Sequence, residues 1–212
     1  MIYIAHRGYS DKCGDNNIPS FLEAVYYGFD MVEMDIQLCK TGEIVVYHDT
    51  YLQEKPICEY TFKELQENEI VCLTTVFDII KIETIKFFLD IKGNADVIYP
   101  LINILRSRFS SRQLQRIYIS GFNRHFVEPL LESKIPVKIG LSIGNSFEKD
   151  DLEYLSRNMN FVCMDWQSLN HENIEMLHNK GILVYTFTCS DDYIWKHMKQ
   201  FKIDGIVSNY VL

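Results

Sequence analysis

The sequence lacks the features that mark several classes of protein. It contains no run of 18 apolar residues, so no segment is long enough for a transmembrane helix. The N-terminus, which reads MIYIAHR, lacks the charged region and apolar core of a signal peptide. There is no linker rich in proline, glycine or serine and no low-complexity tract. These absences predict one folded domain over residues 1–212, the count expected at this length.

Positive charge and paired cysteine motifs are also scarce. The chain has 21 Lys+Arg against 29 Asp+Glu, a formal charge of −8, which argues against a nucleic-acid partner held by a basic surface. A small anion needs only one local positive site, which a metal ion can supply. None of the 6 cysteines forms a C-x-x-C pair, and no histidine pair has zinc-binding spacing. We therefore predict reduced thiols and a cytoplasmic protein.

Short apolar runs rich in β-formers alternate with stretches of helical period along the whole chain. Eight runs are predicted as strands: Ile2–Ala5, Met31–Ile36, Ile85–Ile91, Arg116–Ser120, Val137–Ser142, Phe161–Met164, Leu183–Phe187 and Asp204–Val207. The predicted helices are Pro19–Tyr27, Ala95–Arg108, His125–Glu132, Glu148–Leu155, Glu172–Lys180 and Asp191–Lys199. A further extended run, Glu43–Tyr47, follows Thr41-Gly42 and suggests a hairpin-like excursion. The alternation predicts a compact α/β fold, a (β/α)8 TIM barrel, with an open doubly wound sheet as the alternative.

Ionisable residues gather at the ends of the predicted strands. The first strand ends in His6-Arg7-Gly8, the extra extended run ends in His48-Asp49, and two others carry Glu33-x-Asp35 and Asp90-x-Lys92. In a parallel barrel the carboxyl ends of all strands meet on one face, where active sites lie. We expect these four segments to form one site.

The residue types in this group indicate metal-assisted phosphoryl chemistry. Glu33 and Asp35 point to the same side of their strand, and two such carboxylates are costly to bury without a cation. Oxygen ligands suit Mg²⁺ or Ca²⁺, and Asp90 offers a third carboxylate. Arg7 and Lys92 would offset the remaining negative charge and donate to a phosphate. Two histidines, His6 and His48, are suited to proton transfer near neutral pH.

Taken in order, these residues resemble a known signature. His6-Arg7-Gly8, Glu33-x-Asp35 and His48-Asp49 resemble the HRG…ExD…HD pattern of the glycerophosphodiester phosphodiesterase family. Further matches are Asp15-Asn16-Asn17 to Glu-Asn-Thr, Leu89-Asp90-Ile91-Lys92 to Leu-Glu-Ile-Lys, Thr186-Phe187-Thr188 to Trp-Thr-Val and Asp204–Asn209 to Asp-Gly-Ile-Ile-Thr-Asp. Any one of these matches is weak, but their order and spacing from residue 2 to residue 210 are specific.

The resemblance implies a TIM barrel that hydrolyses glycerophosphodiesters, such as glycerophosphocholine, to an alcohol and glycerol phosphate. It implies one divalent cation, Mg²⁺ or Ca²⁺. Carried over by position, it implies metal ligands at Glu33, Asp35 and Asp90, an acid and a base at His6 and His48, phosphate contacts from Arg7 and Lys92, and pocket walls at Phe122 and Phe187.

The sequence departs from the family pattern at several points. Asp90 stands in place of a glutamate and is one methylene shorter, Phe187 stands at a tryptophan position, and Asn209 replaces an aspartate. The stretch from residue 49 to residue 74 is short where the family inserts a capping segment. The chain ends soon after its eighth strand, and we expect a partner chain, as in a homo-oligomer, or another segment to cover the groove of the closing helix.

Two alternatives stay open at this point. The short cap would suit a bulkier substrate, which makes a lysophospholipase D or a sphingomyelinase-D-like enzyme acting on a lysophospholipid the second hypothesis. A phosphodiester-binding module without turnover is the third. The presence of both histidines and of the Glu33-x-Asp35 pair argues against the third hypothesis.

Overall fold

Eight parallel strands close into a barrel in the computed structural model, which describes residues 1–211. The strands are β1 (Ile2–Ala5), β2 (Met31–Leu38), β7 (Lys86–Ile91), β8 (Ile117–Gly121), β9 (Lys138–Ile143), β10 (Phe161–Asp165), β11 (Leu183–Cys189) and β12 (Gly205–Ser208). Each pairs with its neighbour in parallel, and β1 pairs with both β12 and β2. This closure confirms the TIM barrel and makes the open-sheet alternative wrong.

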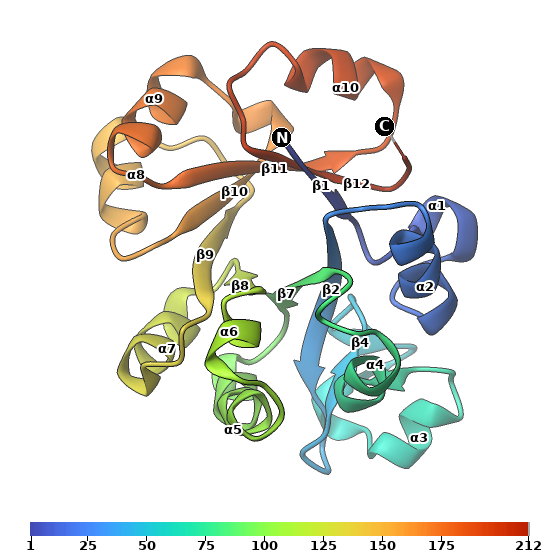
Figure 1. Cartoon of the computed structure of the whole chain (residues 1–212). Coiled ribbons are helices and arrows are strands. Elements are labelled where there is room, and N and C mark those ends of the chain that lie inside the picture. The colour runs from blue at the N-terminus through green and yellow to red at the C-terminus, as the bar shows by residue number, and fades with distance from the viewer. Residues whose placement is uncertain (212) are drawn as a thin grey trace.

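Helices surround the ring of strands (Figure 1). They are α1 (Ser10–Cys13), α2 (Ile18–Tyr26), α3 (Phe62–Gln66), α4 (Leu73–Ile79), α5 (Ile98–Arg108), α6 (Ser111–Leu114), α7 (Val127–Ser133), α8 (Lys149–Leu155), α9 (His171–Asn179) and α10 (Asp192–Met198). Short 3₁₀ turns occur at Ile57–Glu59, Ala95–Val97, Arg124–Phe126 and Trp166–Ser168. Within residues 1–211, no helix has the length and apolar character needed to cross a bilayer.

The first βα unit shows why the sequence folds this way locally. Asn17 caps α2 by accepting a hydrogen bond from the backbone N–H of Ser20 at 2.8 Å. The Ser20 hydroxyl in turn donates to the carbonyl oxygen of Arg7 at 3.0 Å. Gly8 has φ +83° and a Cβ there would lie 2.3 Å from Ser20 Oγ. Only glycine therefore lets the first turn of α2 approach the end of β1.

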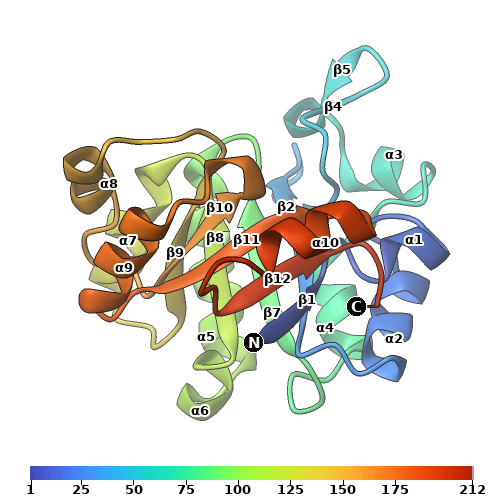
Figure 2. The ribbon, with the colours of Figure 1, turned by 90° about the horizontal axis from the view of Figure 1, so that it is seen from above.

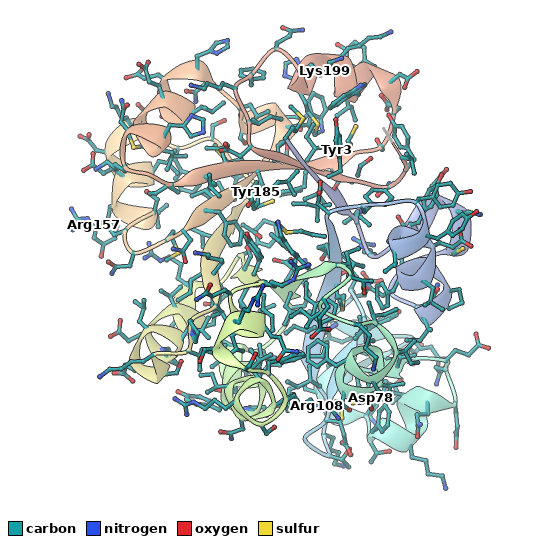
Figure 3. The ribbon with its side chains drawn as sticks, in the orientation of Figure 1. Tyr3, Asp78, Arg108, Arg157, Tyr185 and Lys199 are labelled. Carbon is teal, nitrogen blue, oxygen red and sulfur yellow. The ribbon has the colours of Figure 1, made fainter. Side chains whose placement is uncertain are left out.

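The barrel interior is filled with aromatic side chains. Phe88, Tyr118, Phe161 and Tyr185 form a buried cluster inside the ring, and Figure 3 labels Tyr185 there. Phe161 packs where a Cβ on Gly140 would lie 2.3 Å from its ring, so the small residue makes room for the large one. A larger apolar layer lies between the strands and the helices. The lower barrel is thus a packed core, and the cavity lies above it.

A small appendage lies outside the barrel, between β2 and β7. Strand β3 (Ile44–Val46) pairs antiparallel with β2, and β6 (Val71–Cys72) pairs with β3. The hairpin of β4 (Tyr51–Leu52) and β5 (Lys55–Pro56) projects away from the body, as Figure 2 shows. The appendage has its own buried cluster of Cys39, Val45, Ile57, Leu65 and Ile70. The predicted hairpin-like excursion and reduced insertion are both present.

Helix α4 is the main element that the periodicity did not predict. It follows β6 directly, and its N-cap, Cys72, makes no side-chain hydrogen bond to the helix. Its first turns, Leu-Thr-Thr-Val-Phe, are rich in β-branched and aromatic residues of weak helix propensity. Three of its residues, Leu73, Val76 and Phe77, are buried against the barrel. Tertiary burial therefore selects the helix where local signals do not.

Candidate active site

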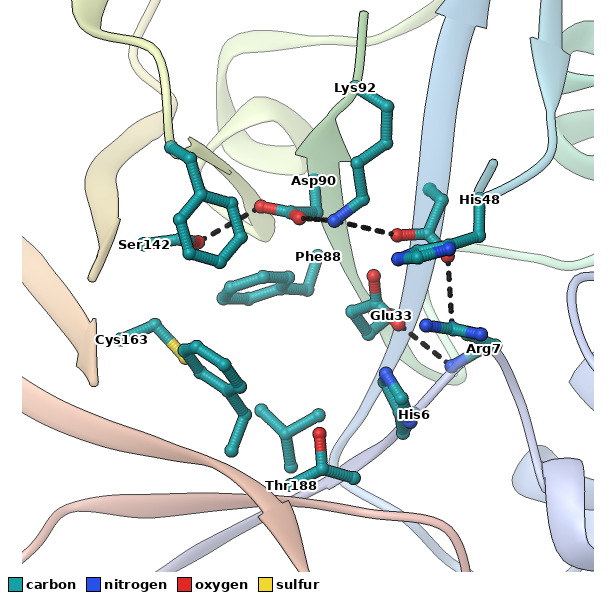
Figure 4. A pocket seen from close by; sticks show the side chains of 14 residues that line it. His6, Arg7, Glu33, His48, Phe88, Asp90, Lys92, Ser142, Cys163 and Thr188 are labelled. Atoms are coloured by element: carbon teal, nitrogen blue, oxygen red, sulfur yellow. Dashed lines mark hydrogen bonds and ion pairs between the residues drawn. The ribbon is translucent and has the colours of Figure 1, made fainter. Parts of the chain in front are cut away.

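One cavity opens at the carboxyl ends of the strands (Figure 4). It is lined by side chains from all eight barrel strands or the turns after them, and by His48 from the segment after β3. The lining residues are His6, Arg7, Glu33, Asp35, His48, Phe88, Asp90, Lys92, Phe122, Ser142, Cys163, Phe187, Thr188 and Val207. Every site residue predicted from the sequence is among them. Chain-distant motifs thus meet because parallel strands all end on the same face.

Three carboxylates form the floor of the polar side. One oxygen from each of Glu33, Asp35 and Asp90 lies within 4.8 Å of the others, and none of these residues is more than 6% exposed. Asp35 and Asp90 are direct neighbours in the β2–β7 register. An all-oxygen set at this spacing fits a hard divalent cation such as Mg²⁺ or Ca²⁺.

Two basic side chains contact the carboxylates (Figure 4). Lys92 Nζ lies 3.2 Å from Asp35 and donates a hydrogen bond to Asp90. Arg7 Nε lies 3.2 Å from Asp35, and the Arg7 backbone N–H donates to Glu33 at 2.7 Å. Three carboxylates against two cations leave a net charge of −1 in a buried place. A bound divalent cation would change this net charge from −1 to +1. The charge of the site and its oxygen ligands therefore both favour such a cation.

Burial and neighbouring charge act on each carboxyl differently. Burial, together with the charges of Asp35 and Asp90, raises the pKa of Glu33 well above its usual value. Burial also raises the pKa of Asp90 and outweighs the opposing effect of Lys92. The pKa of Asp35 is lowered despite burial, because Lys92 and a hydrogen bond from Asn16 favour its charged form. The cluster is therefore strained electrostatically at Glu33, which lacks a basic side chain of its own.

The two histidines have different partners. His6 Nδ1 lies 2.6 Å from the amide oxygen of Asn209, whereas His48 Nδ1 lies 2.7 Å from a carboxylate oxygen of Asp49. Burial and the nearby Arg7 guanidinium lower the pKa of His6. His6 is therefore neutral at pH 7, and its partner oxygen selects the Nδ1–H tautomer, which leaves Nε2 as a proton acceptor.

The opposite side of the cavity is apolar. Phe122 and Phe187 meet edge to face, with ring centroids 5.9 Å apart at 86°, and Phe122 is 53% exposed at the rim. Lys92 Nζ lies 5.4 Å from the Phe122 centroid. Phe88, Cys163 and Val207 continue this surface inward. The cavity thus has one face lined by charged side chains and one lined by apolar side chains.

Some residues that shape the site carry no isolated sequence signal. Ser142 donates to Asp90 at 3.0 Å and pairs with Ser120 at 2.7 Å. Asn16 donates to Asp35 at 2.7 Å and accepts from its backbone N–H at 3.2 Å. The match of Asp15-Asn16-Asn17 to the family motif draws attention to Asn16. Its two hydrogen bonds to Asp35 are visible only in the folded barrel. Asn209 lies 203 residues from His6 and stands where the family has an aspartate, so nothing in the sequence pattern predicts its contact with His6.

The chain is similar to known phosphodiesterases over nearly its full length. It is 24% identical over 228 residues to a glycerophosphodiester phosphodiesterase of Caldanaerobacter subterraneus, covering 98% of this chain and 93% of that protein. The structure of an Oleispira antarctica phosphodiesterase in complex with the product sn-glycerol-3-phosphate matches with a TM-score of 0.83 at 22% identity, over 99% and 93% of the two chains. A glycerophosphodiester phosphodiesterase structure from Thermotoga maritima gives 0.78 at 24% identity, over 99% and 94%.

The structural likenesses establish the fold, and the sequence family establishes the class. The model of the glycerophosphoryl diester phosphodiesterase family matches residues 6–212. That span contains all of the strand-end motifs that line the cavity. The protein is a member of the glycerophosphoryl diester phosphodiesterase family of enzymes.

Proposed function

We propose that the protein is a metal-dependent hydrolase of glycerophosphodiesters, including glycerophosphocholine, that releases the alcohol and glycerol phosphate. The observation that carries the proposal is the meeting of three carboxylates, two histidines and two basic side chains around one cavity. Family membership supports the reaction class. The substrate of this chain, the metal and the roles of single residues are parts of the proposal.

Glu33, Asp35 and Asp90 would hold the metal. When bound, Mg²⁺ or Ca²⁺ supplies positive charge that stabilises the negative charge developing on the phosphoryl oxygens. Ser142 and Asn16 orient two of these carboxylates through the hydrogen bonds described above. Arg7 and Lys92 bind the phosphodiester as hydrogen-bond donors, because both line the cavity beside the carboxylates.

His6 and His48 move the protons. His6, held neutral with Nε2 free, accepts a proton from the attacking water as the water oxygen forms a new bond to phosphorus. His48 donates a proton to the oxygen of the departing alcohol as the old P–O bond breaks. The carboxylate of Asp49, 2.7 Å from Nδ1, offsets the positive charge of the protonated His48 ring. One proton is taken and one is returned, so the step balances.

A lipid substrate is the second candidate. The apolar face of the cavity and the half-exposed Phe122 at its rim favour it, since a lysophospholipid places a long acyl chain beyond the glycerol. A lysophospholipase D or sphingomyelinase-D-like activity would use the same polar groups. The two candidate substrates therefore differ in the group that would contact the aromatic face of the cavity.

The deciding assay compares glycerophosphocholine with lysophosphatidylcholine. Choline and glycerol phosphate, or lysophosphatidate in the lipid reaction, are measured with Mg²⁺, with Ca²⁺ and with EDTA. We expect turnover of the first substrate that requires metal. Turnover of lysophosphatidylcholine alone would move the protein to the lipid branch. No turnover of either, followed by none across a wider head-group panel, would contradict the hydrolase and favour a binding module.

We also propose that the protein is cytoplasmic. All six cysteines are free, including Cys39, Cys72, Cys163 and Cys189, which are buried. Thiols persist in reducing compartments, so this state supports a cytoplasmic location. Fractionation of cells that express the full-length chain tests it, and recovery of the protein outside the cytoplasm would contradict it.

A further inference from the structure

Gln37 is a buried amide beside the catalytic cavity that does not line it. It follows Glu33 and Asp35 at the next position on the same side of β2, and it is only 3% exposed. Its Nε2 donates two hydrogen bonds, to the carbonyl oxygen of Tyr47 at 2.6 Å and to that of Asp49 at 2.8 Å. Because a primary amide nitrogen carries two hydrogens, both donors are used.

The two acceptors flank His48. We propose that Gln37 is a positioning residue that fixes the His48 imidazole by holding the peptide units on both sides of it against β2. His48 lies beyond the end of β3, which stops at Val46, and its side chain is 40% exposed. The proposal rests on the proposed function for its catalytic consequence, but the clamp itself is a property of the fold.

The chemistry of the site favours glutamine over its near relatives. An ionised glutamate of the same shape has no donor and would set its charge against two carbonyl oxygens. Asparagine is one methylene shorter and would not reach both carbonyls from the same backbone position. On the other side, a Cβ at Gly93, which has φ +61°, would lie 3.3 Å from Gln37 Oε1. Gln37 therefore fits between the segment of His48 and the segment that follows Lys92.

Loss of the clamp should affect the chemical step more than binding. A displacement of about 1 Å in a catalytic group lowers the rate about 10²-fold. We therefore expect Gln37→Leu to lower kcat about 10- to 100-fold while KM and the Kd for Ca²⁺, measured by calorimetry, change less than about threefold. The metal ligands and the basic side chains stay in place in this variant.

Hydrogen exchange provides a readout that does not depend on turnover. In Gln37→Leu, the amides of Tyr47 and Ile57, which donate at 2.9 Å to the carbonyl oxygens of Asp35 and Thr50, should exchange at least about tenfold faster than in the wild type, while the barrel strands stay protected. If the leucine variant does not fold, the isosteric Gln37→Glu carries the same two tests. It keeps the shape of the side chain and removes both donors when ionised or one of the two when protonated.

Asn173→Leu is the matched control. Asn173 is a buried amide, 4% exposed, that donates to the carbonyl oxygen of Phe147 at 3.2 Å, and it is not among the residues that line the cavity. Both leucine variants lose a buried amide, but only Gln37→Leu should lose kcat and the protection of the Tyr47 and Ile57 amides. Unchanged exchange at Tyr47 and Ile57, a kcat within twofold of wild type, or an equal loss of kcat in the control would overturn the proposal. A wild-type enzyme without turnover would refute the proposed function and leave exchange to decide the clamp.

Discussion

Glu33→Gln should stabilise the metal-free protein while removing its response to metal. Glu33 is 4% exposed, and its charged form is opposed by burial and by the charges of Asp35 and Asp90. Glutamine has nearly the same shape and keeps an oxygen that accepts from the Arg7 backbone N–H, 2.7 Å away in the wild type. The change therefore removes a repulsive charge and keeps the packing.

The size of the effect follows from the geometry of the cluster. Single stabilising substitutions commonly yield about 0.5–2 kcal/mol. Because all three carboxylates lie within 4.8 Å of one another and are shielded from water, we expect the upper half of this range, about 1–2 kcal/mol. For a chain of this length this raises Tm by about 2–8 °C. Differential scanning calorimetry in EDTA measures it.

Added metal should reverse the order of the melting temperatures of the wild type and Glu33→Gln. A ligand present at 100 times its Kd stabilises the folded state by about 2.7 kcal/mol, which exceeds the expected gain of Glu33→Gln. In saturating Mg²⁺ or Ca²⁺ the wild type should therefore melt above the variant, and in EDTA below it. A variant that is less stable in EDTA, or that gains as much from metal as the wild type, would refute the electrostatic reasoning.

Four other substitutions test separate parts of the structure. His6→Ala and His48→Ala should each lower kcat about 10²- to 10⁴-fold with an unchanged circular dichroism spectrum, since each removes a proton-transfer group; a near wild-type rate would remove that residue from the mechanism. Asp90→Asn should raise the metal concentration needed for half-maximal activity, and an unchanged titration would exclude Asp90 as a ligand. Gly140→Ala should lower stability by about 1–3 kcal/mol in urea unfolding because the new Cβ overlaps the Phe161 ring; unchanged stability would show that Phe161 repacks freely.

The barrel could be predicted because each of its strands is a buried apolar run bounded by turn residues. Every predicted strand overlaps an observed one, with ends that differ by at most two residues. The floor of the site could be predicted for a related reason, since Glu33, Asp35 and Asp90 lie on two strands that the parallel barrel places side by side. The predicted strands therefore indicate both the fold and the position of the carboxylates.

The supporting contacts could not be read in this way. The partner of His6 lies 203 residues away, and the two acceptors of Gln37 are backbone carbonyls that any residue could supply. Helix α4 forms because its apolar side chains meet the barrel, although its N-terminus lacks a capping side chain. These features depend on distances between elements, which local patterns do not encode.

His48 is held by the appendage and not by a strand of the ring. The strands that close the ring carry the carboxylates, whereas His48 arrives on a segment that pairs with β2 from outside and continues into the β4–β5 hairpin. Residues can therefore be added to or removed from this hairpin without changing the register of any barrel strand. The position of His48 and the space left for a substrate can therefore change while the ring and its carboxylates stay the same.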